Sequence, residues 1–143
     1  LRPLEKLEHK IENFKETTNH RYSRYIVDYA IKNGCGTIQM EKLSGVASND
    51  SFLKTWSYYD LQTKIEYKAK DVGIDVKYIE PRYTSQRCNR CGVIDKASRV
   101  TQDQFKCTTC GHTTNADLNA SRNIAMKDIE TIIQNQIEIQ KVI

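Results

Sequence analysis

The cysteines of this 143-residue chain are spaced like the ligands of a metal site. Cys88, Cys91, Cys107 and Cys110 form two C-x2-C pairs with fifteen residues between them. Two short knuckles with this spacing bring four thiolates around one tetrahedral Zn2+, and four thiolates leave no position open for a substrate. The pattern therefore predicts a structural zinc ribbon. His112, just after the last cysteine, is expected to lie at the surface or to contact phosphate.

The segment between the cysteine pairs is too poor in apolar residues to fold without the metal. Its large apolar side chains are Val93, Ile94, Val100 and Phe105. Zinc binding should therefore supply much of the local folding free energy. We expect chelation to unfold the ribbon.

The fifth cysteine and the hydropathy of the chain indicate its environment. Cys35 lies outside the two pairs, and an odd cysteine count with C-x-x-C spacing argues against a secreted disulfide framework. We expect a reducing, cytoplasmic location, with Cys35 as a small buried side chain. No apolar run approaches the roughly 20 residues of a membrane span, so no membrane association is expected.

Two carboxylates occupy positions typical of a metal-dependent active site. Glu41 ends a predicted strand, and Asp117 begins a predicted helix after the ribbon. Ligand sites in α/β sheets form at the carboxyl ends of strands. Hydrolysis of a phosphodiester by two Mg2+ ions about 3.5 to 4 Å apart requires carboxylate oxygens to hold the pair. The alternative is a solvated Glu41 and an Asp117 that complements the helix dipole.

The positive charge of the chain is concentrated around the ribbon. Residues 77–106 hold seven basic and three acidic side chains, whereas the remainder holds fifteen of each. Such a surface attracts a phosphate backbone, although a merely solvated charged face is the alternative. The predicted nucleic-acid contacts are Arg82, Arg87, Arg90, Lys96, Arg99 and Lys106.

The first half of the chain reads as helix, helix, strand, helix, strand. Apolar spacing predicts two helices from Pro3 to Lys32, with a kink or break between them at Thr17–Asn19 and a stop at Asn33–Gly34. A strand follows at Thr37–Glu41, then a loop at Ser44–Ser51. The next predicted elements are a helix at Phe52–Val72, ended by Gly73, and a strand at Ile74–Ile79, closed by Pro81.

After the ribbon, the chain is predicted to return to a helix. Asn115 is the expected N-cap, which places Asp117 in the first turn of a helix through Met126. Further apolar residues extend the face of this helix: Ile129, Ile132, Ile133 and Ile137. The predicted organisation is α/β, with sheet-forming residues 1–82, a ribbon insert at 83–114 and a C-terminal helix at 115–143.

The order of short motifs along the chain resembles one protein family. The motifs are Ile38–Leu43, Trp56–Tyr59, Tyr67–Ala69, Gly73–Ile74, Tyr83–Gln86, the four cysteines and Asn115–Ala120. This order resembles the C-terminal half of TnpB (OrfB) transposon-encoded nucleases and compact type V CRISPR effector nucleases. The resemblance covers essentially the whole chain. It implies part of an RNase H-like (RuvC) domain with an inserted zinc ribbon.

The resemblance also implies roles for particular residues. Glu41 matches the central glutamate of the family and Asp117 its final aspartate, which together hold catalytic Mg2+. Arg99 best fits an arginine that often joins the active site from between the cysteine pairs. The first aspartate of the family has no counterpart here, since Asp28 falls within a helix and Asp75 follows Glu41.

The missing aspartate implies that the chain alone is inactive. The chain starts at Leu1 rather than Met, so we expect it to belong to a longer protein. That parent would be an RNA-guided DNA endonuclease whose upstream RuvC segment and guide-RNA-binding regions lie elsewhere. Two alternatives stay open: a non-catalytic zinc-ribbon module that binds nucleic acid, and a purely structural zinc-stapled interaction domain. Neither the target-adjacent motif, the oligomeric state nor the choice between transposon nuclease and CRISPR effector follows from the residues.

Overall fold

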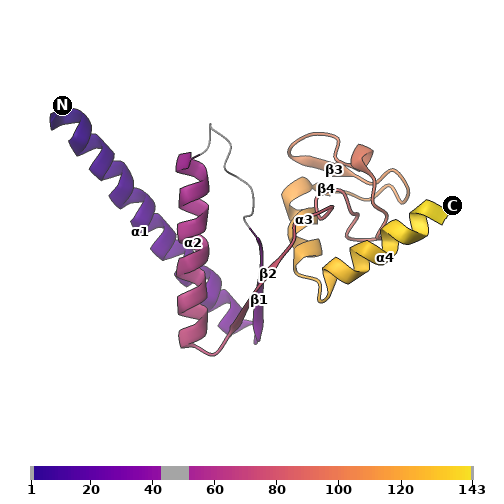
Figure 1. Cartoon of the computed structure of the whole chain (residues 1–143), viewed down its shortest axis with the longest axis horizontal. Coiled ribbons are helices and arrows are strands. Elements are labelled where there is room, and N and C mark those ends of the chain that lie inside the picture. Colours follow the sequence, from indigo (N-terminus) through magenta and orange to yellow (C-terminus); the bar gives the residue numbers. More distant parts are fainter. Residues whose placement is uncertain (1, 43–51, 143) are drawn as a thin grey trace. The chain divides into compact units, whose positions relative to one another are not determined.

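The computed structural model describes residues 2–42 and 52–142, and the predicted loop Ser44–Ser51 lies outside them. The chain folds as two compact units. The helical unit comprises Leu1–Ile38 and Leu43–Lys77, and the ribbon unit comprises Gln39–Lys42 and Tyr78–Ile143. Both helices and strands are present, as predicted (Figure 1). In the described residues, no helix is long and apolar enough to cross a membrane.

The first helix, α1, runs without interruption from Arg2 to Lys32. The predicted break at Thr17–Asn19 is therefore wrong. Asn19 is buried, and its side-chain amide donates to Ser57 O and to an Asp60 carboxylate oxygen, both at 2.8 Å. These bonds to a neighbouring helix outweigh the weak helix propensity of asparagine.

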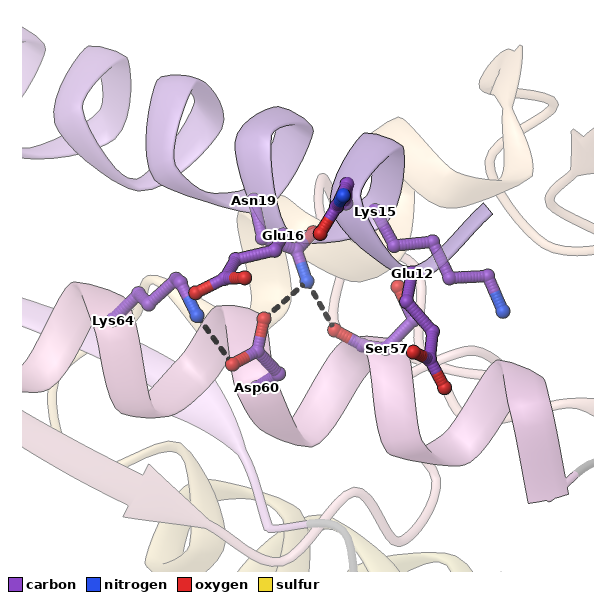
Figure 2. A pocket seen from close by; sticks show the side chains of 8 residues that line it. Glu12, Lys15, Glu16, Asn19, Ser57, Asp60 and Lys64 are labelled. Carbon is purple, nitrogen blue, oxygen red and sulfur yellow. Dashed lines mark hydrogen bonds and ion pairs between the residues drawn. The ribbon is translucent and has the colours of Figure 1, made fainter. Parts of the chain in front are cut away.

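The second helix, α2, spans Phe52–Asp71 and packs along α1. The buried residues of the two helices include both apolar and polar side chains. They include Val27, Ala30, Ile65 and Ala69 together with Ser23 and Lys68. A polar cavity of about 370 Å3 separates the two helices farther along, and Figure 2 shows Asp60 in it between the Asn19 amide and the Lys64 ammonium.

The face of α1 away from these contacts carries an apolar stripe. Its exposed members recur at helical spacing: Leu4, Leu7, Ile11, Phe14, Tyr22, Tyr25 and Tyr29. The predicted helix stops are confirmed, because α1 ends before Gly34 at φ +65° and α2 before Gly73 at φ +75°. Both glycines adopt the left-handed conformation that favours glycine.

Two strands follow these helix ends. Strand β1 covers Thr37–Glu41, and strand β2 covers Asp75–Ile79, and the two form a sheet. Gly36 O accepts from Asp75 N at one end, and Lys42 N donates to Ile79 O at the other. These bonds make the strands parallel, so α2 serves as the crossover helix between them.

The ribbon unit combines a small hairpin with two C-terminal helices. Strands β3, Gln104–Lys106, and β4, Thr113–Asn115, pair antiparallel after a short 3-10 turn, η1, at Lys96–Ser98. Helices α3, Ala116–Ile124, and α4, Ile129–Val142, then follow. The predicted single C-terminal helix is therefore two helices.

A sharp reversal separates α3 from α4. Asp128 has φ +57°, a left-handed conformation that cannot continue a helix. In addition, the carbonyls of Ile124 and Met126 accept from the side chain of Gln39, which fixes the end of α3. The predicted apolar face is confirmed in part, because Ile129 and Ile133 of α4 are buried against Ile79.

Candidate functional site

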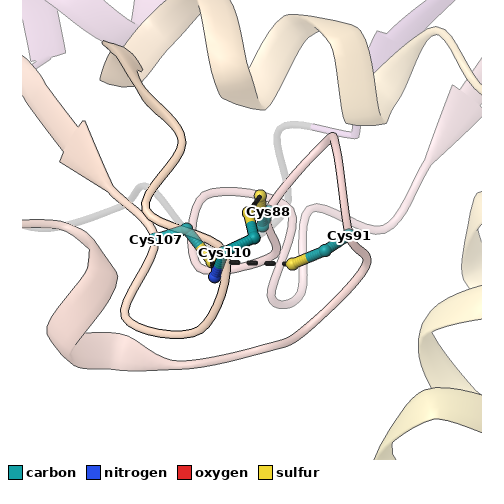
Figure 3. A group of neighbouring side chains, drawn as sticks. All are labelled: Cys88, Cys91, Cys107 and Cys110. Carbon is teal, nitrogen blue, oxygen red and sulfur yellow. Dashed lines mark hydrogen bonds between the residues drawn. The ribbon is translucent and has the colours of Figure 1, made fainter.

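The four cysteines converge on one point, as Figure 3 shows. Their sulfur atoms all lie within 4.8 Å of one another. Cys88 Sγ is 3.8 Å from Cys110 Sγ, and Cys91 Sγ is 3.5 Å from Cys107 Sγ. Four sulfurs at about 2.3 Å from a tetrahedral Zn2+ would stand about 3.8 Å apart. The cluster therefore fits a structural zinc ion.

Each cysteine pair is shaped by the same turn. Cys88 N donates to Val93 O while Gly92 N donates to Cys88 O, and Cys107 and Gly111 repeat this pattern with His112 O. Gly92 has φ +83°, and a Cβ there would stand 3.2 Å from Arg87 Nη2. Any larger residue at position 92 would be strained by the backbone and would press on that guanidinium.

Without a bound metal, the thiols of Cys91 and Cys107 differ in pKa. Burial raises the pKa of Cys91 to about 12. Burial also opposes ionisation of Cys107, but backbone N–H groups of Cys110 and Thr109 and the neighbouring thiols bring its pKa down to about 7. Zinc binds thiolates, so loading the cluster must release protons.

His112 and the fifth cysteine, Cys35, lie differently from their predicted places. His112 is half-buried, and its Nε2 atom is sheltered from solvent without a hydrogen-bond partner in the structure, so this nitrogen is not at the surface. Cys35 is exposed rather than buried. It follows the end of α1, where its backbone N–H donates to Ala30 O.

Arg87 is buried beside the first knuckle. Its Nη1 donates to Asn123 Oδ1 at 2.8 Å. Burial lowers the pKa of Arg87, and the nearby Cys88 and Cys91 thiolates oppose this. A buried guanidinium bonded in this way does not fit the predicted direct contact with nucleic acid. We assign Arg87 to the support of the knuckle, where its charge offsets that of the thiolates.

Helix α3 is attached to the first knuckle by two fully buried asparagines, Asn119 and Asn123. Asn119 Nδ2 donates to Arg87 O at 2.8 Å, and Asn119 Oδ1 accepts from Asn89 N at 3.0 Å. Asn123 Nδ2 donates to the carbonyls of Thr84 and Arg87. Sequence reasoning missed these roles. The available signal was two asparagines four residues apart in a helix interior, where this residue type is unfavourable unless it is bonded.

Helix α4 holds the ribbon in a similar manner. The Gln140 amide donates to Ile94 O at 3.1 Å and accepts from Ile94 N at 3.3 Å. Ile129 and Ile133 of the same helix pack with Ile79 in a buried cluster. The ribbon is thus attached to both C-terminal helices by side-chain amides that pair with its backbone.

Glu41 is the last residue of β1 and is half-buried. Burial raises the pKa of this carboxyl group. Gln39, two residues earlier, shares its face of the strand because side chains alternate along a strand. Gln39 bonds the carbonyls at the end of α3, at 3.0 Å for Met126 O. Glu41 therefore lies on the face of β1 that is turned toward α3.

Asp117 stands exposed in the first turn of α3, as predicted. Asn115 is the N-cap, and its Oδ1 accepts from the backbone N–H groups of Asp117 and Leu118 at 3.0 Å. Asn115 also pairs with Gln104 in the hairpin. Glu41 and Asp117 thus belong to the same compact unit.

The other predicted contact residues lie on the ribbon and just before it. Arg82, Arg90, Lys96 and Lys106 are exposed. Arg99 is half-buried, and its Nη2 donates to Gln102 O at 3.1 Å. Within residues 2–42 and 52–142, no ion pair neutralises any of these five side chains. Their charge is available to a ligand.

Comparisons with known proteins agree with this geometry. Residues 58–124 match the model of the Cas12f1-like TNB domain. The chain is 58% identical over 139 residues to the CRISPR-associated endodeoxyribonuclease Cas12f1 of Sulfoacidibacillus thermotolerans, covering 96% of this chain and 33% of that protein. It is 44% identical over 167 residues to the protein of the same name from Syntrophomonas palmitatica, covering 95% and 34%.

A solved structure shows the same fold. The cryo-EM structure of a Cas12f1-sgRNA-target DNA complex matches with a TM-score of 0.71 and 32% identity, over 86% of this chain and 36% of that one. A mixed α/β segment with a zinc-binding cysteine cluster is therefore present, consistent with part of a RuvC domain and its zinc finger. The chain belongs to the Cas12f and TnpB family of nucleases. It spans about a third of the length of the curated relatives described above.

Proposed function

We propose that this chain supplies two of the three acidic ligands of an RNA-guided, Mg2+-dependent DNA endonuclease of the RuvC type. The observation that carries the proposal is the attachment of β1 to the C-terminal end of α3 through Gln39, which turns Glu41 toward the helix whose first turn holds Asp117. The remaining aspartate would come from an upstream segment of the parent protein. The chain by itself would then not cut DNA.

The proposed site divides the work among a few side chains. Bound Mg2+ would activate water and stabilise the leaving oxygen. Glu41 and Asp117 would provide carboxylate oxygens for the metal. Arg99, oriented by its bond to Gln102 O, would contact the scissile phosphate.

The exposed basic side chains extend this site into a path for DNA. Arg82, Arg90, Lys96 and Lys106 would draw single-stranded DNA along the ribbon through its phosphates. Arg82 also lies 5.3 Å from the centre of the Tyr83 ring, a pairing that presents a charge and an aromatic face together. Sequence specificity would come from a guide RNA bound by upstream regions, not from these residues.

The relatives support this proposal by their own names and partners. The Sulfoacidibacillus relative is named an endodeoxyribonuclease, and a matching structure is a complex with guide RNA and target DNA. Transfer of those partners to this chain is part of the proposal. A cytoplasmic location goes with it, because guide RNA and target DNA are found together there in a bacterium or archaeon.

Nuclease activity on single-stranded DNA with Mg2+ tests the proposal. The chain alone should not cut, whereas the same chain joined to its native upstream sequence should. In the joined protein, Asp117→Ala and Glu41→Gln should each abolish cutting, because each removes a metal ligand. Asp75→Ala is the matched control, since Asp75 is exposed at the start of β2 and should be dispensable.

A second candidate function, a nucleic-acid-binding module without catalysis, is favoured by the unneutralised basic side chains of the ribbon. It predicts that the joined protein fails to cut while the chain binds DNA in a zinc-dependent way. That result would replace the nuclease proposal.

A further inference from the structure

The two hydrogen bonds of the Asn119 side chain flank Cys88, one of the four predicted zinc ligands. Its amide donates to the carbonyl of Arg87 and accepts from the N–H of Asn89, the residues on either side of Cys88. Cys88 and Asn119 are both fully buried. The amide can make both bonds only while the backbone around Cys88 keeps the curvature of the knuckle, which a bound metal would fix.

Asn123 extends this attachment by one helical turn. Its Nδ2 donates to Thr84 O at 2.8 Å and to Arg87 O at 2.7 Å, and its Oδ1 accepts from the Arg87 guanidinium. The donor and acceptor groups of this buried amide are thus all used. A buried amide that lost such partners would be left unsatisfied at substantial cost.

The other end of α3 is fixed by the second half of the ribbon. Ala116 N donates to Asp103 O, and the N-cap Asn115 pairs with Gln104 in the hairpin. Phe105 and Ala116 share a buried cluster with Cys88 and Cys107. The first turn of α3, which carries Asp117, is therefore held between the first knuckle and the hairpin.

We propose that Asn119 and Asn123 are positioning residues that couple zinc occupancy to the placement of Asp117. Without zinc, the knuckle no longer holds Arg87 O and Asn89 N in place, so α3 loses its attachment and Asp117 its fixed position. By linkage, zinc must bind more weakly when the asparagine bonds are absent. The inference rests on the proposed function only where it concerns Asp117 as a metal ligand.

Amide hydrogen exchange of the chain, with zinc and after chelation, tests the coupling. Zinc removal should increase exchange in 116–121 of α3 together with 84–91. In zinc-loaded Asn119→Asp, exchange in 116–121 should rise while the hairpin 104–115 stays protected, because that substitution removes the donor to Arg87 O. Zinc affinity should fall about 10- to 100-fold, the usual effect of losing a partner that supports a metal ligand.

Two controls separate coupling from general loss of stability. Asn135→Asp makes the same chemical change on an exposed part of α4 and should alter neither zinc affinity nor exchange of α3. Ile133→Val weakens a buried apolar contact and should not single out 116–121. The proposal is overturned if zinc removal leaves exchange of 116–121 unchanged in the unmodified chain, or if Asn119→Asp and Asn135→Asp bind zinc equally. These results do not depend on nuclease activity, which the joined protein tests separately.

Discussion

The two units of the chain are stabilised in different ways. The helical unit buries Val27, Ile65 and Ala69 between α1 and α2, together with polar side chains such as Asn19 and Lys68. The ribbon unit buries few apolar residues around its hairpin and adds four thiolates and paired amides. We therefore expect one unit to depend on direct packing between helices, and the other on a bound metal ion and the hydrogen bonds around its ligands.

The same difference separates the buried asparagines of the two units. In the helical unit, Asn19 joins two helices that also have an apolar contact. In the ribbon unit, Asn119 joins a helix to a knuckle whose cysteines are placed to bind a metal ion. Conditions that remove the metal should therefore act on one unit and spare the other.

The largest expected effect is the loss of the metal. Chelation, or Cys107→Ser, should unfold the ribbon unit completely, since structural zinc contributes roughly 10–16 kcal/mol in small zinc modules. Helical circular dichroism from α1 and α2 should persist. Cys35→Ser is the matched control and should change nothing, because Cys35 lies outside the cluster. If both units unfolded together on chelation, the division between them would be wrong.

An intermediate effect is expected from Asn19→Ala. The substitution removes the side-chain donor that bonds Ser57 O and one carboxylate oxygen of Asp60, which should lower the free energy of unfolding of the helical unit by about 1–3 kcal/mol. Thermal unfolding of the zinc-loaded chain measures this change. Zinc affinity should stay as in the unmodified chain; a weaker zinc site in Asn19→Ala would show that the two units share their stability.

The smallest expected effect is a difference between the two units in the pH at which acid destabilises them. Burial opposes ionisation of Asp60, but hydrogen bonds from Asn19 and Lys64 hold its pKa below the ordinary 3.8. The folded state therefore favours the ionised form, so Asp60 stabilises the helical unit above pH 3.8 and loses this contribution as the pH falls further. The ribbon unit should unfold at higher pH, because protons compete with zinc for the thiolates.

The acid titration needs two probes. Zinc release reports on the ribbon unit. The helical circular dichroism that persists after zinc release reports on the helical unit, which holds the two longest helices, α1 and α2. Asp60→Asn should flatten the second transition and leave the first in place. Coincident transitions in the unmodified chain would contradict this order.

The sequence allowed prediction where a local pattern has one dominant cause. The cysteine spacing predicted the ligand cluster, and Asn115 predicted both the start of α3 and the first-turn place of Asp117. The strand at Thr37–Glu41 was also found as predicted, because its alternation and the preceding Gly34 act locally.

Prediction failed where a distant partner decides the outcome. The continuity of α1 at Asn19 depends on Ser57 and Asp60, which lie some forty residues away. The burial of Arg87 depends on Asn123, so its charge alone suggested a surface contact that the structure does not provide. The end of α3 likewise depends on Gln39. Spacing along the chain contains no signal for such pairings.

The apolar stripe along α1 bears on how the purified chain behaves in solution. Seven large side chains, from Leu4 to Tyr29, present hydrocarbon and aromatic surface to water along one side of a 31-residue helix. Sulfate and phosphate salts strengthen attraction between such surfaces, and cold weakens it. The colloidal stability of the chain should therefore decline on warming and on salting out well before either unit unfolds, so turbidity is a poor measure of its folding.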